Sequence, residues 1–361
     1  LGAKDTIARI RNPEYFTLFM GKELGLSMMV NPEYETAMEI FRILRLPAAA
    51  KVEPFGGGKL ELVEFKITKD NPLNKLSLLH IRSKFPGKYL VCAVQRKDEL
   101  IIPRGDFVLA EGDKIDITGS PKEINSLFKA LGILKGAAKK VMIVGGGKIA
   151  FYLASELKAM GHQIKIIEKD EMGCHKLADM LSKVEIIHGD GTEQQVLIQE
   201  GLLRTDAFIA LTDNDEQNIV ISLFADGKGV KKVIAKVNTL SFHGMLDNSG
   251  VESIVSPKLI TASIIARYVR GKENSMGSSV STLYSIANEK AEALEFNAKS
   301  SFSGLNIPLK DLSIKDNILI ASILRNNTVI TPTGSDTIQD GDSVIVVSSK
   351  QILDDLEDIL N

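Results

Sequence analysis

A glycine-rich turn between a strand pattern and a helix pattern most constrains how this chain can fold. Residues 139–144, KKVMIV, predict a buried parallel strand, and the apolar residues after the turn recur at helical spacing. The turn has the form Gly145-x-Gly147-x-x-Ala150, and a second strand pattern, QIKIIE, ends at Glu168. Strand, glycine turn, helix and carboxylate in this order predict a dinucleotide-binding βαβ unit.

Each residue of this motif has its own physical role. Gly145 permits the tight turn from strand to helix, and Gly147 lets a phosphate approach the backbone because it has no Cβ. Ala150 allows close packing of helix and sheet, and the helix N-terminus offers free N–H groups to an anion. Glu168 can accept hydrogen bonds from ribose hydroxyls and would repel a 2′-phosphate, which disfavours NADP.

The alternation of strands and helices continues downstream. The segments VEIIHGDGT, DAFIAL and KKVIAKV predict three more strands separated by helices, which indicates a parallel sheet. Ligands of such sheets bind at the carboxyl ends of the strands. For Asn214 and Asp215 helix N-capping and ligand contact both remain open. Polar residues that gather at these ends are Asp190, Thr192, Thr212, Asp213, Asn214 and Lys236.

The chain also repeats itself. IARIR near the N-terminus resembles IAKVN, and VNPEYETAMEIFR (30–42) resembles VSPKLITASIIAR (255–267). EGDKIDITGS and DGDSVIVVSS are matching alternating runs with Gly-Asp turns, which predict β-rich units. Each of these units ends in a predicted helical tail, PKEINSLFKALG or KQILDDLEDIL, and GKENSMGSSVST (271–282) has a linker composition.

The repeats predict four segments of two alternating kinds. The first Rossmann-type segment begins at the equivalent of the fifth strand, so its glycine turn and four strands are not in this sequence. Because a lone fifth strand is not a stable sheet, we expect that the chain is a fragment or that another segment supplies this half. The predicted segments are 1–50, 55–134, 138–271 and 280–361.

Composition excludes several function classes. The formal net charge of −2 gives no global positive field, so nucleic acid is not an expected partner. The two cysteines, Cys92 and Cys174, have no CxxC spacing, and the five histidines form neither HxH nor HExxH, so we expect no disulfide framework and no metal site. No apolar run approaches the length of a transmembrane helix.

Several motifs together resemble the TrkA family, the tandem RCK (regulator of potassium conductance) regulatory subunits of Trk potassium uptake systems. The resemblance covers the whole chain, but the front part of the first lobe of such proteins is missing from this sequence. It implies an α/β fold in which Rossmann-like RCK N-lobes with a parallel sheet alternate with small α+β RCK C-lobes. The motifs are GGGKIA (145–150), GDGT (189–192), LTDNDEQN (211–218), ARIRNPEY (8–15) and EGDKIDITG (111–119).

The resemblance also implies a function without chemistry. It implies binding of NAD, NADH, ATP or ADP, assembly into a homo-oligomeric ring, and control of a TrkH/TrkG-like membrane potassium-transporting subunit from the cytoplasmic face of the membrane. Arg9 and Arg11 are candidates to contact a neighbouring subunit's phosphate, or are ordinary strand-end cations. The implied nucleotide contacts are Gly145, Gly147, Lys148, Ile149, Ala150, Glu168, Lys169, Asp190, Gly191, Thr192, Thr212, Asp213, Asn214 and Lys236.

Two other function classes remain open. A nicotinamide-dependent oxidoreductase would need an acid–base group beside the nicotinamide, for which His188 and Tyr152 are the nearby candidates. A nucleotide sensor could instead act on a soluble partner. We expect no catalytic residue, and a small effector between paired C-lobes, such as a cyclic dinucleotide, stays open in this family.

Overall fold

The structure, a computed structural model, divides into two compact units. Leu1–Ala50 groups with Gly136–Ile264 in unit 1, and Lys51–Lys135 with Ile265–Asn361 in unit 2. Lobes of the same kind thus pair, while the limits of the four segments remain a prediction. The described residues are 3–11, 26–46, 48–97, 99–133, 138–239, 241–242, 251, 253–274, 280–286, 291–349 and 353–361.

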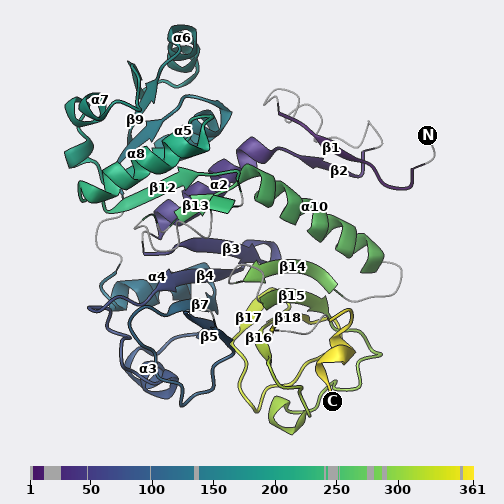
Figure 1. Ribbon diagram of the computed structural model, residues 1–361. Helices are drawn as coiled ribbons and strands as arrows, with labels where there is room; N and C mark the ends of the chain where they lie inside the picture. The colour runs from purple at the N-terminus through teal and green to yellow at the C-terminus, as the bar shows by residue number, and fades with distance from the viewer. Residues whose placement is uncertain are drawn as a thin grey trace. The chain divides into compact units, whose positions relative to one another are not determined.

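The second N-lobe, predicted at 138–271, contains a parallel sheet of six strands in the order β10-β9-β8-β11-β12-β13, of which Figure 1 labels β9, β12 and β13. Five of these strands were predicted. Four of the predictions agree with the sheet to within a residue or two, and the fifth, VEIIHGDGT, is a strand only over Glu185–His188. The sixth strand, β13, was not predicted. The strands are β8 (Lys140–Val144), β9 (Gln163–Glu168), β10 (Glu185–His188), β11 (Ala207–Ala210), β12 (Lys232–Lys236) and β13 (Ser253–Val255).

Helices cover both faces of this sheet. Apolar residues of α2 (Pro32–Arg45), α5 (Lys148–Ala159) and α6 (Glu171–Met180) share one core with one face. Residues of α7 (Gln194–Gln199) and α8 (Asp215–Gly227) share a second core with the other face. The sheet is therefore doubly wound, and its carboxyl edge is left to the loops.

The first segment of the chain matches the end of the second N-lobe. β1 (Ile7–Arg9) pairs in parallel with β2 (Met28–Val30), as β12 pairs with β13. In α2 the Thr36 hydroxyl donates to the Pro32 carbonyl at 2.6 Å, and in α10 (Pro257–Asn274) Thr261 donates to Pro257 at 2.6 Å. The predicted repeat thus recurs in three dimensions. The linker prediction for 271–282 is partly wrong, since α10 runs to Asn274 and β14 begins at Val280.

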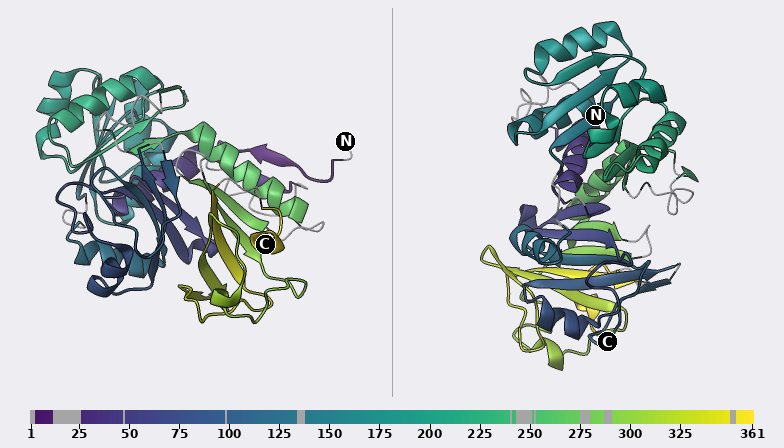
Figure 2. Two further views of the ribbon diagram at one scale, coloured as in Figure 1. Left: turned by 60° about the horizontal axis from the view of Figure 1, so that its bottom comes forward. Right: turned by 90° about the vertical axis from the view of Figure 1, so that its left-hand side faces the viewer.

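Unit 2 contains two antiparallel sheets with the same strand connectivity, β3-β4-β7-β5-β6 and β14-β15-β18-β16-β17. Figure 2 shows strands of both C-lobes in two further views. The first C-lobe sheet has β3 (Lys51–Phe55), β4 (Leu60–Lys66), β5 (Tyr89–Arg96), β6 (Glu99–Ile101) and β7 (Lys114–Gly119), with helices α3 (Leu78–Lys84) and α4 (Pro121–Ala130). The second has β14 (Val280–Ile286), β15 (Ala291–Asn297), β16 (Ile318–Arg325), β17 (Thr328–Ile330) and β18 (Ser343–Ser349).

The two C-lobes share one apolar core. Leu62 and Cys92 of the first lobe are buried in the same cluster as Ala293 and Val347 of the second. Burial of these side chains against each other removes apolar area from water, which stabilises the pairing of the two C-lobes.

The predicted helical tails differ from each other. PKEINSLFKALG forms α4, but the described part of the last tail, 353–361, has only the short 3-10 helix Leu356–Ile359. The Asp358 side chain accepts from the N–H groups of Asp354 and Asp355. These bonds satisfy backbone donors at the start of the short helix. The longer helix predicted for this tail is therefore wrong for these residues. The other 3-10 helices are Gly56–Gly58, Leu202–Arg204 and Leu309–Asp311.

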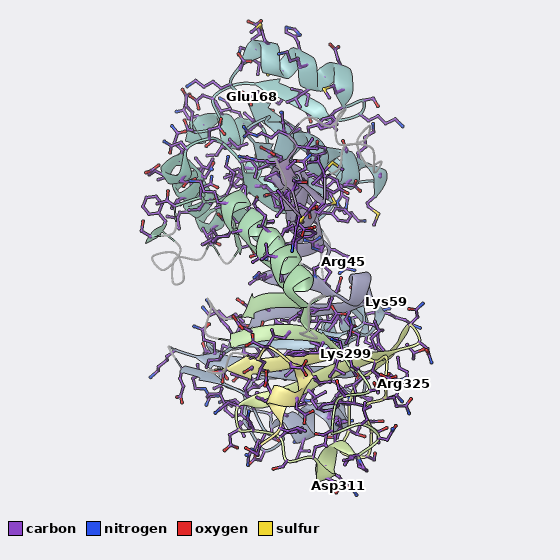
Figure 3. All side chains as sticks on the ribbon, turned by 90° about the vertical axis from the view of Figure 1, so that its right-hand side faces the viewer. Arg45, Lys59, Glu168, Lys299, Asp311 and Arg325 are labelled. Atoms are coloured by element: carbon purple, nitrogen blue, oxygen red, sulfur yellow. The ribbon has the colours of Figure 1, made fainter. Side chains whose placement is uncertain are left out.

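The same arginine–aspartate pair closes the Gly-Asp turn of each C-lobe. Asp342 is 1% exposed and accepts from Arg325 Nε at 2.9 Å, from Arg325 Nη2 at 2.7 Å and from the Gln339 N–H at 2.8 Å (Figure 3 labels Arg325). Asp113 accepts equivalent bonds from Arg96 and Ala110. The turn glycines have φ of 90° and 82°, which explains the repeated Gly-Asp signature.

We expect Asp342→Asn to lower the free energy of unfolding by about 2 kcal/mol, because a buried, charge-assisted fork loses one acceptor and its charge. Urea unfolding followed by circular dichroism measures this. Asp340→Asn, which neutralises an exposed carboxylate in the same turn, is the control. Equal losses in the two variants would contradict the role of the fork.

Candidate functional site

A pocket opens at the carboxyl edge of the second N-lobe sheet. Its volume is about 360 Å³, within the roughly 300–1,000 Å³ common for small-molecule sites. Glu168, at the end of β9, is one wall (Figure 3). The lining residues are Val144, Gly145, Gly146, Gly147, Ile167, Glu168, Lys169, Asp170, Gly173, Asp190, Gly191, Thr192, Leu211, Thr212, Asp213 and Gln217.

The three glycines of the turn differ in what surrounds them. Gly145 has φ +98°, and a Cβ there would lie 2.9 Å from backbone atoms of Leu211. A Cβ on Gly146 would lie 2.5 Å from Leu177 Cδ1. Gly147 has φ −70° and nothing within 4 Å of a built Cβ. Gly145 is therefore required by the fold, Gly146 is crowded by the side chains of Leu177 and Glu168, and Gly147 leaves an open space beside the pocket.

Helix α5 begins at this turn without a side-chain cap. Its N-cap is Gly147, and among the described residues no side chain accepts from its first-turn N–H groups. By contrast, Asn31, Asp170 and Asn214 cap α2, α6 and α8. The N–H groups and the positive end of the α5 dipole are thus available to an anion in the pocket.

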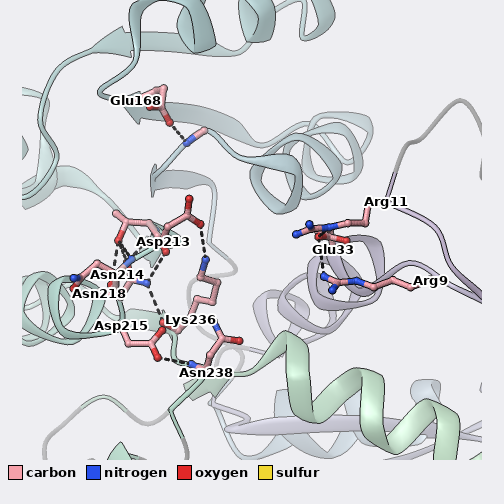
Figure 4. Close-up of polar contacts among 12 residues, drawn as sticks. Arg9, Arg11, Glu33, Glu168, Asp213, Asn214, Asp215, Asn218, Lys236 and Asn238 are labelled. Atoms are coloured by element: carbon pink, nitrogen blue, oxygen red, sulfur yellow. Dashed lines mark hydrogen bonds and ion pairs between the residues drawn. The ribbon is translucent and has the colours of Figure 1, made fainter.

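Glu168 holds the turn from the neighbouring strand. Its Oε2 accepts from the Gly146 N–H (Figure 4), and its Oε1 accepts from the Asp170 N–H at 2.8 Å. A carboxylate has further lone pairs, so it can also accept from ligand hydroxyls. The side chain is half-buried at the pocket wall, where such hydroxyls would lie.

An ion pair spans the mouth of the pocket between the ends of β9 and β10. Lys169 Nζ lies 2.6 Å from Asp190 Oδ2, and Asp190 Oδ1 accepts from the Thr192 N–H and hydroxyl at 3.0 and 2.6 Å. The Lys169 ammonium and the Thr192 donors lower the pKa of Asp190 to about 2. Asp190 is therefore ionised at neutral pH.

Two buried polar side chains organise the other wall without lining the pocket: Asn218, which was not predicted as a contact, and Asp215, for which capping and ligand contact were both left open. Asp215 is the first residue of α8, and the cap of that helix is Asn214. The Asn218 amide accepts from the Thr212 N–H at 2.9 Å and donates to the Lys236 carbonyl at 2.9 Å, which ties the ends of β11 and β12 together. Asp215 accepts from the N–H groups of Asn238 and Thr239, each at 2.9 Å. Burial would raise the pKa of Asp215, but these bonds and the Thr239 hydroxyl lower it below its usual value. Asn218 lies within the motif LTDNDEQN, and its spacing from Thr212 is the sequence signal that could have identified it.

The structure brings most of the predicted contacts together, and places others outside the lining. Ile149 and Ala150 are buried in the core, Lys148 is exposed at the first position of α5, and Asn214 caps α8 by accepting from the Gln217 N–H at 2.7 Å. Lys236 lies behind the lining, with Nζ 3.4 Å from Asp213 Oδ1. Of these five, Lys236 and Asn214 contact lining residues through their side chains, namely Asp213 and Gln217. The predicted residues that line the pocket are Gly145, Gly147, Glu168, Lys169, Asp190, Gly191, Thr192, Thr212 and Asp213.

Arg9 and Arg11 lie together at a separate place. Arg11 Nε is 2.7 Å and Arg9 Nη2 is 3.4 Å from Oε1 of Glu33, a carboxylate that is 8% exposed (Figure 4). Both guanidinium side chains remain more than half exposed. Neither belongs to the pocket lining within this chain.

The two acid–base candidates also lie outside the pocket lining. His188 Nε2 is 3.1 Å from the Lys169 carbonyl, and the Tyr152 hydroxyl accepts from Asn31. Within the described ranges, no group of three or more His, Cys, Asp or Glu side chains could hold a metal ion. A search of the same ranges finds no helix with the length and apolarity needed to span a bilayer.

A second hollow, of about 760 Å³, lies between the two C-lobes of unit 2. Arg82 and Arg104 of the first lobe and Lys310 and Lys315 of the second contribute cations to its wall. It shares no residue with the pocket at the glycine turn.

A doubly wound lobe with a glycine-rich Rossmann turn, accompanied by paired C-lobes, defines a protein of the tandem RCK type. The TrkA-N domain family model matches residues 141–257, and the TrkA-C domain model matches 62–132 and 295–361. Among solved structures, the RCK domain of GsuK superposes with a TM-score of 0.57 at 18% identity, covering 96% of this chain and 72% of that chain.

Curated relatives then give the particular family. A TrkA homologue of Methanosarcina mazei is 31% identical over 344 residues, which are 94% of this chain and 75% of the relative. TrkA of Halomonas elongata is 28% identical, covering 96% of this chain and 77% of the relative. The chain belongs to the family of Trk system potassium uptake protein TrkA.

We expect Gly145→Ala to lower the free energy of unfolding by about 2–4 kcal/mol, because a positive φ and a backbone clash coincide there. Gly147→Ala should lower it by less, about 0.5–1 kcal/mol, since its φ is ordinary and the space is open, and the remaining loss arises because alanine is a poorer N-cap than glycine. Thermal unfolding of the two variants beside the wild type measures both values. Similar losses would contradict the different roles assigned to these glycines.

Proposed function

We propose that this protein is a cytoplasmic regulatory subunit of a potassium uptake system that binds an adenosine nucleotide, NAD(H) or ATP/ADP, in the pocket at the glycine turn. It would act on a TrkH/TrkG-like membrane subunit, at the inner face of the membrane, by changing conformation when the nucleotide binds. Such a device needs only different affinities for the nucleotide in two conformations.

The observation that carries the proposal is that a helix start without a side-chain cap and a carboxylate lie at the same pocket. The α5 N-terminus and the open face of Gly147 suit a diphosphate, and Glu168 suits the hydroxyls of the adenosine ribose. Asp190 and Thr192 would contact the ribose or base, and Asp213 and Lys236 would lie nearer the phosphates.

The relatives support the wider role. Those reported above bear the name of a potassium uptake protein. A GsuK channel whose structure was solved bound to NAD shares the fold, with a TM-score of 0.55 at 18% identity. In a ring of such subunits, Arg9 and Arg11, held by Glu33, would reach the terminal phosphate of a neighbour's nucleotide.

The lining residues argue for a regulator rather than an oxidoreductase. Among the described residues of the pocket wall there is no histidine or tyrosine to transfer a proton to a carbonyl substrate. Incubation of the protein with NADH and a panel of carbonyl compounds, followed by absorbance, separates the two classes. Turnover would overturn the regulatory proposal.

Gly147→Asp is expected to abolish nucleotide binding while the protein stays folded. The carboxylate would occupy the phosphate position and repel it, yet Asp is a good N-cap and Gly147 has room for it. Calorimetric titration with NADH, NAD, ATP and ADP in turn measures the loss. In cells that carry the membrane subunit, potassium uptake should no longer respond to the nucleotide when this protein has the Gly147→Asp substitution.

The matched control is Gly227→Asp, which adds the same charge at an open position at the end of α8. It should bind nucleotides as the wild type does. If Gly147→Asp retained wild-type affinity, the phosphate would not lie over this turn.

Glu168→Ala should weaken NADH binding by about 1–3 kcal/mol, the usual loss when a hydrogen-bonded carboxylate is removed. It should also reduce the preference for NADH over NADPH, because the repulsion of the 2′-phosphate disappears with the charge. Titration of both nucleotides against the variant measures these effects. Glu171→Ala, which removes an exposed carboxylate on α6, is the control, and an equal effect there would refute the role of Glu168.

A further inference from the structure

Helix α2 of the first segment is joined to helix α5 of the second N-lobe by a polar contact at its start. Asn31 is fully buried, and its Oδ1 caps α2 by accepting from the Tyr34 N–H at 3.0 Å. Its Nδ2 donates to the Tyr152 hydroxyl of α5 at 2.9 Å. The rings of Tyr34 and Tyr152 meet edge to face with centroids 5.4 Å apart, a favourable aromatic geometry.

This contact lies on the helix that begins at the pocket. Gly147 is the N-cap of α5, and Tyr152 is little more than one turn further along. Beyond the polar contact, Ala37 and Ile40 of α2 share a core with Leu153 of α5. A ligand held by the α5 N-terminus would therefore act on the helix to which α2 is attached.

The chain that leaves α2 is also fastened to the second N-lobe. The buried Lys232 donates from Nζ to the Ala49 carbonyl at 2.6 Å, and the Ser253 hydroxyl donates to the Ala50 carbonyl at 3.3 Å. β3, the first strand of the first C-lobe, begins at the next residue, Lys51. Ala49 and Ala50, which directly precede this strand, are thus attached to the second N-lobe through their carbonyl groups.

The internal repeat shows that capping alone does not require asparagine at position 31. Ser256 occupies the equivalent position before α10, where its hydroxyl accepts from the Leu259 N–H at 3.4 Å. A serine caps a helix about as well as asparagine does, but it lacks a second polar atom that could reach a partner further away. The additional bond to Tyr152 distinguishes Asn31 from its repeat.

We propose that Tyr152 and Asn31 are positioning residues that couple occupancy of the pocket to helix α2. This inference rests on the proposed nucleotide binding. A bound nucleotide stabilises α5 against local opening, and the Tyr152–Asn31 hydrogen bond extends that stabilisation to the first turns of α2. The coupling is reciprocal, so the state of α2 also affects nucleotide affinity.

The test is hydrogen–deuterium exchange of the whole chain with and without saturating NADH, whose affinity for each variant is first measured by calorimetry. In the wild type, NADH should slow exchange of amides 34–38 by roughly two- to tenfold, the range that one net hydrogen bond can supply. Tyr152→Phe, which removes only the hydroxyl, and Asn31→Ser, which keeps a cap, should each lose this NADH-dependent difference. The double variant should lose no more than either single one, because both remove the same bond.

The matched control is Tyr89→Phe, which removes the hydroxyl that donates to the Phe85 carbonyl in the first C-lobe. It should keep the full NADH-dependent difference in α2. If the wild type binds NADH and amides 34–38 do not respond, or if both link variants still respond, the coupling inference is overturned. If calorimetry detects no nucleotide binding to the wild type, the proposed function fails, and this inference fails with it.

Discussion

The hydrogen bond from the Gly146 N–H to the Glu168 carboxylate is the interaction on which the pocket geometry depends. It joins the turn after β8 to the end of β9, and Gly145 can follow this path only because its φ is positive. With the turn fixed in this way, α5 starts at Gly147, which lines the pocket. The start of this helix and the Glu168 carboxylate, the two groups proposed to bind phosphate and ribose, are thereby placed at the same pocket.

Comparison of the two repeats separates the interactions that occur in both of them from those that occur in only one. The arginine–aspartate fork of the Gly-Asp turn occurs in both C-lobes, and the Thr-to-Pro hydrogen bond occurs in both α2 and α10. Interactions kept in both repeats explain how each unit folds. Where the repeats differ, as at Asn31 and Ser256, the extra contact of Asn31 connects the first segment to the second N-lobe within unit 1.

Much of the second N-lobe could be predicted from the sequence, because buried parallel strands and a glycine turn have strong local patterns. The runs before Gly145 and Glu168 became β8 and β9 nearly to the residue, and most predicted contacts line the pocket. Contacts between distant segments could not be predicted. The docking of α2 on α5, the shared core of the C-lobes and the bond between Asn218 and Lys236 depend on tertiary packing, for which one sequence carries no periodic signal. The last tail shows the same limit. Apolar residues at helical spacing predicted a longer helix, but the described residues form only a short one, with the Asp358 side chain bonded to the backbone at its start.

The most direct test of the account is a crystal structure of the chain grown with NADH. The account predicts density for a diphosphate over the N–H groups at the start of α5, with the adenosine ribose hydroxyls at the Glu168 carboxylate. Density for the nucleotide at another place, or a turn at 145–147 covered by side chains with no room for a ligand, would contradict it.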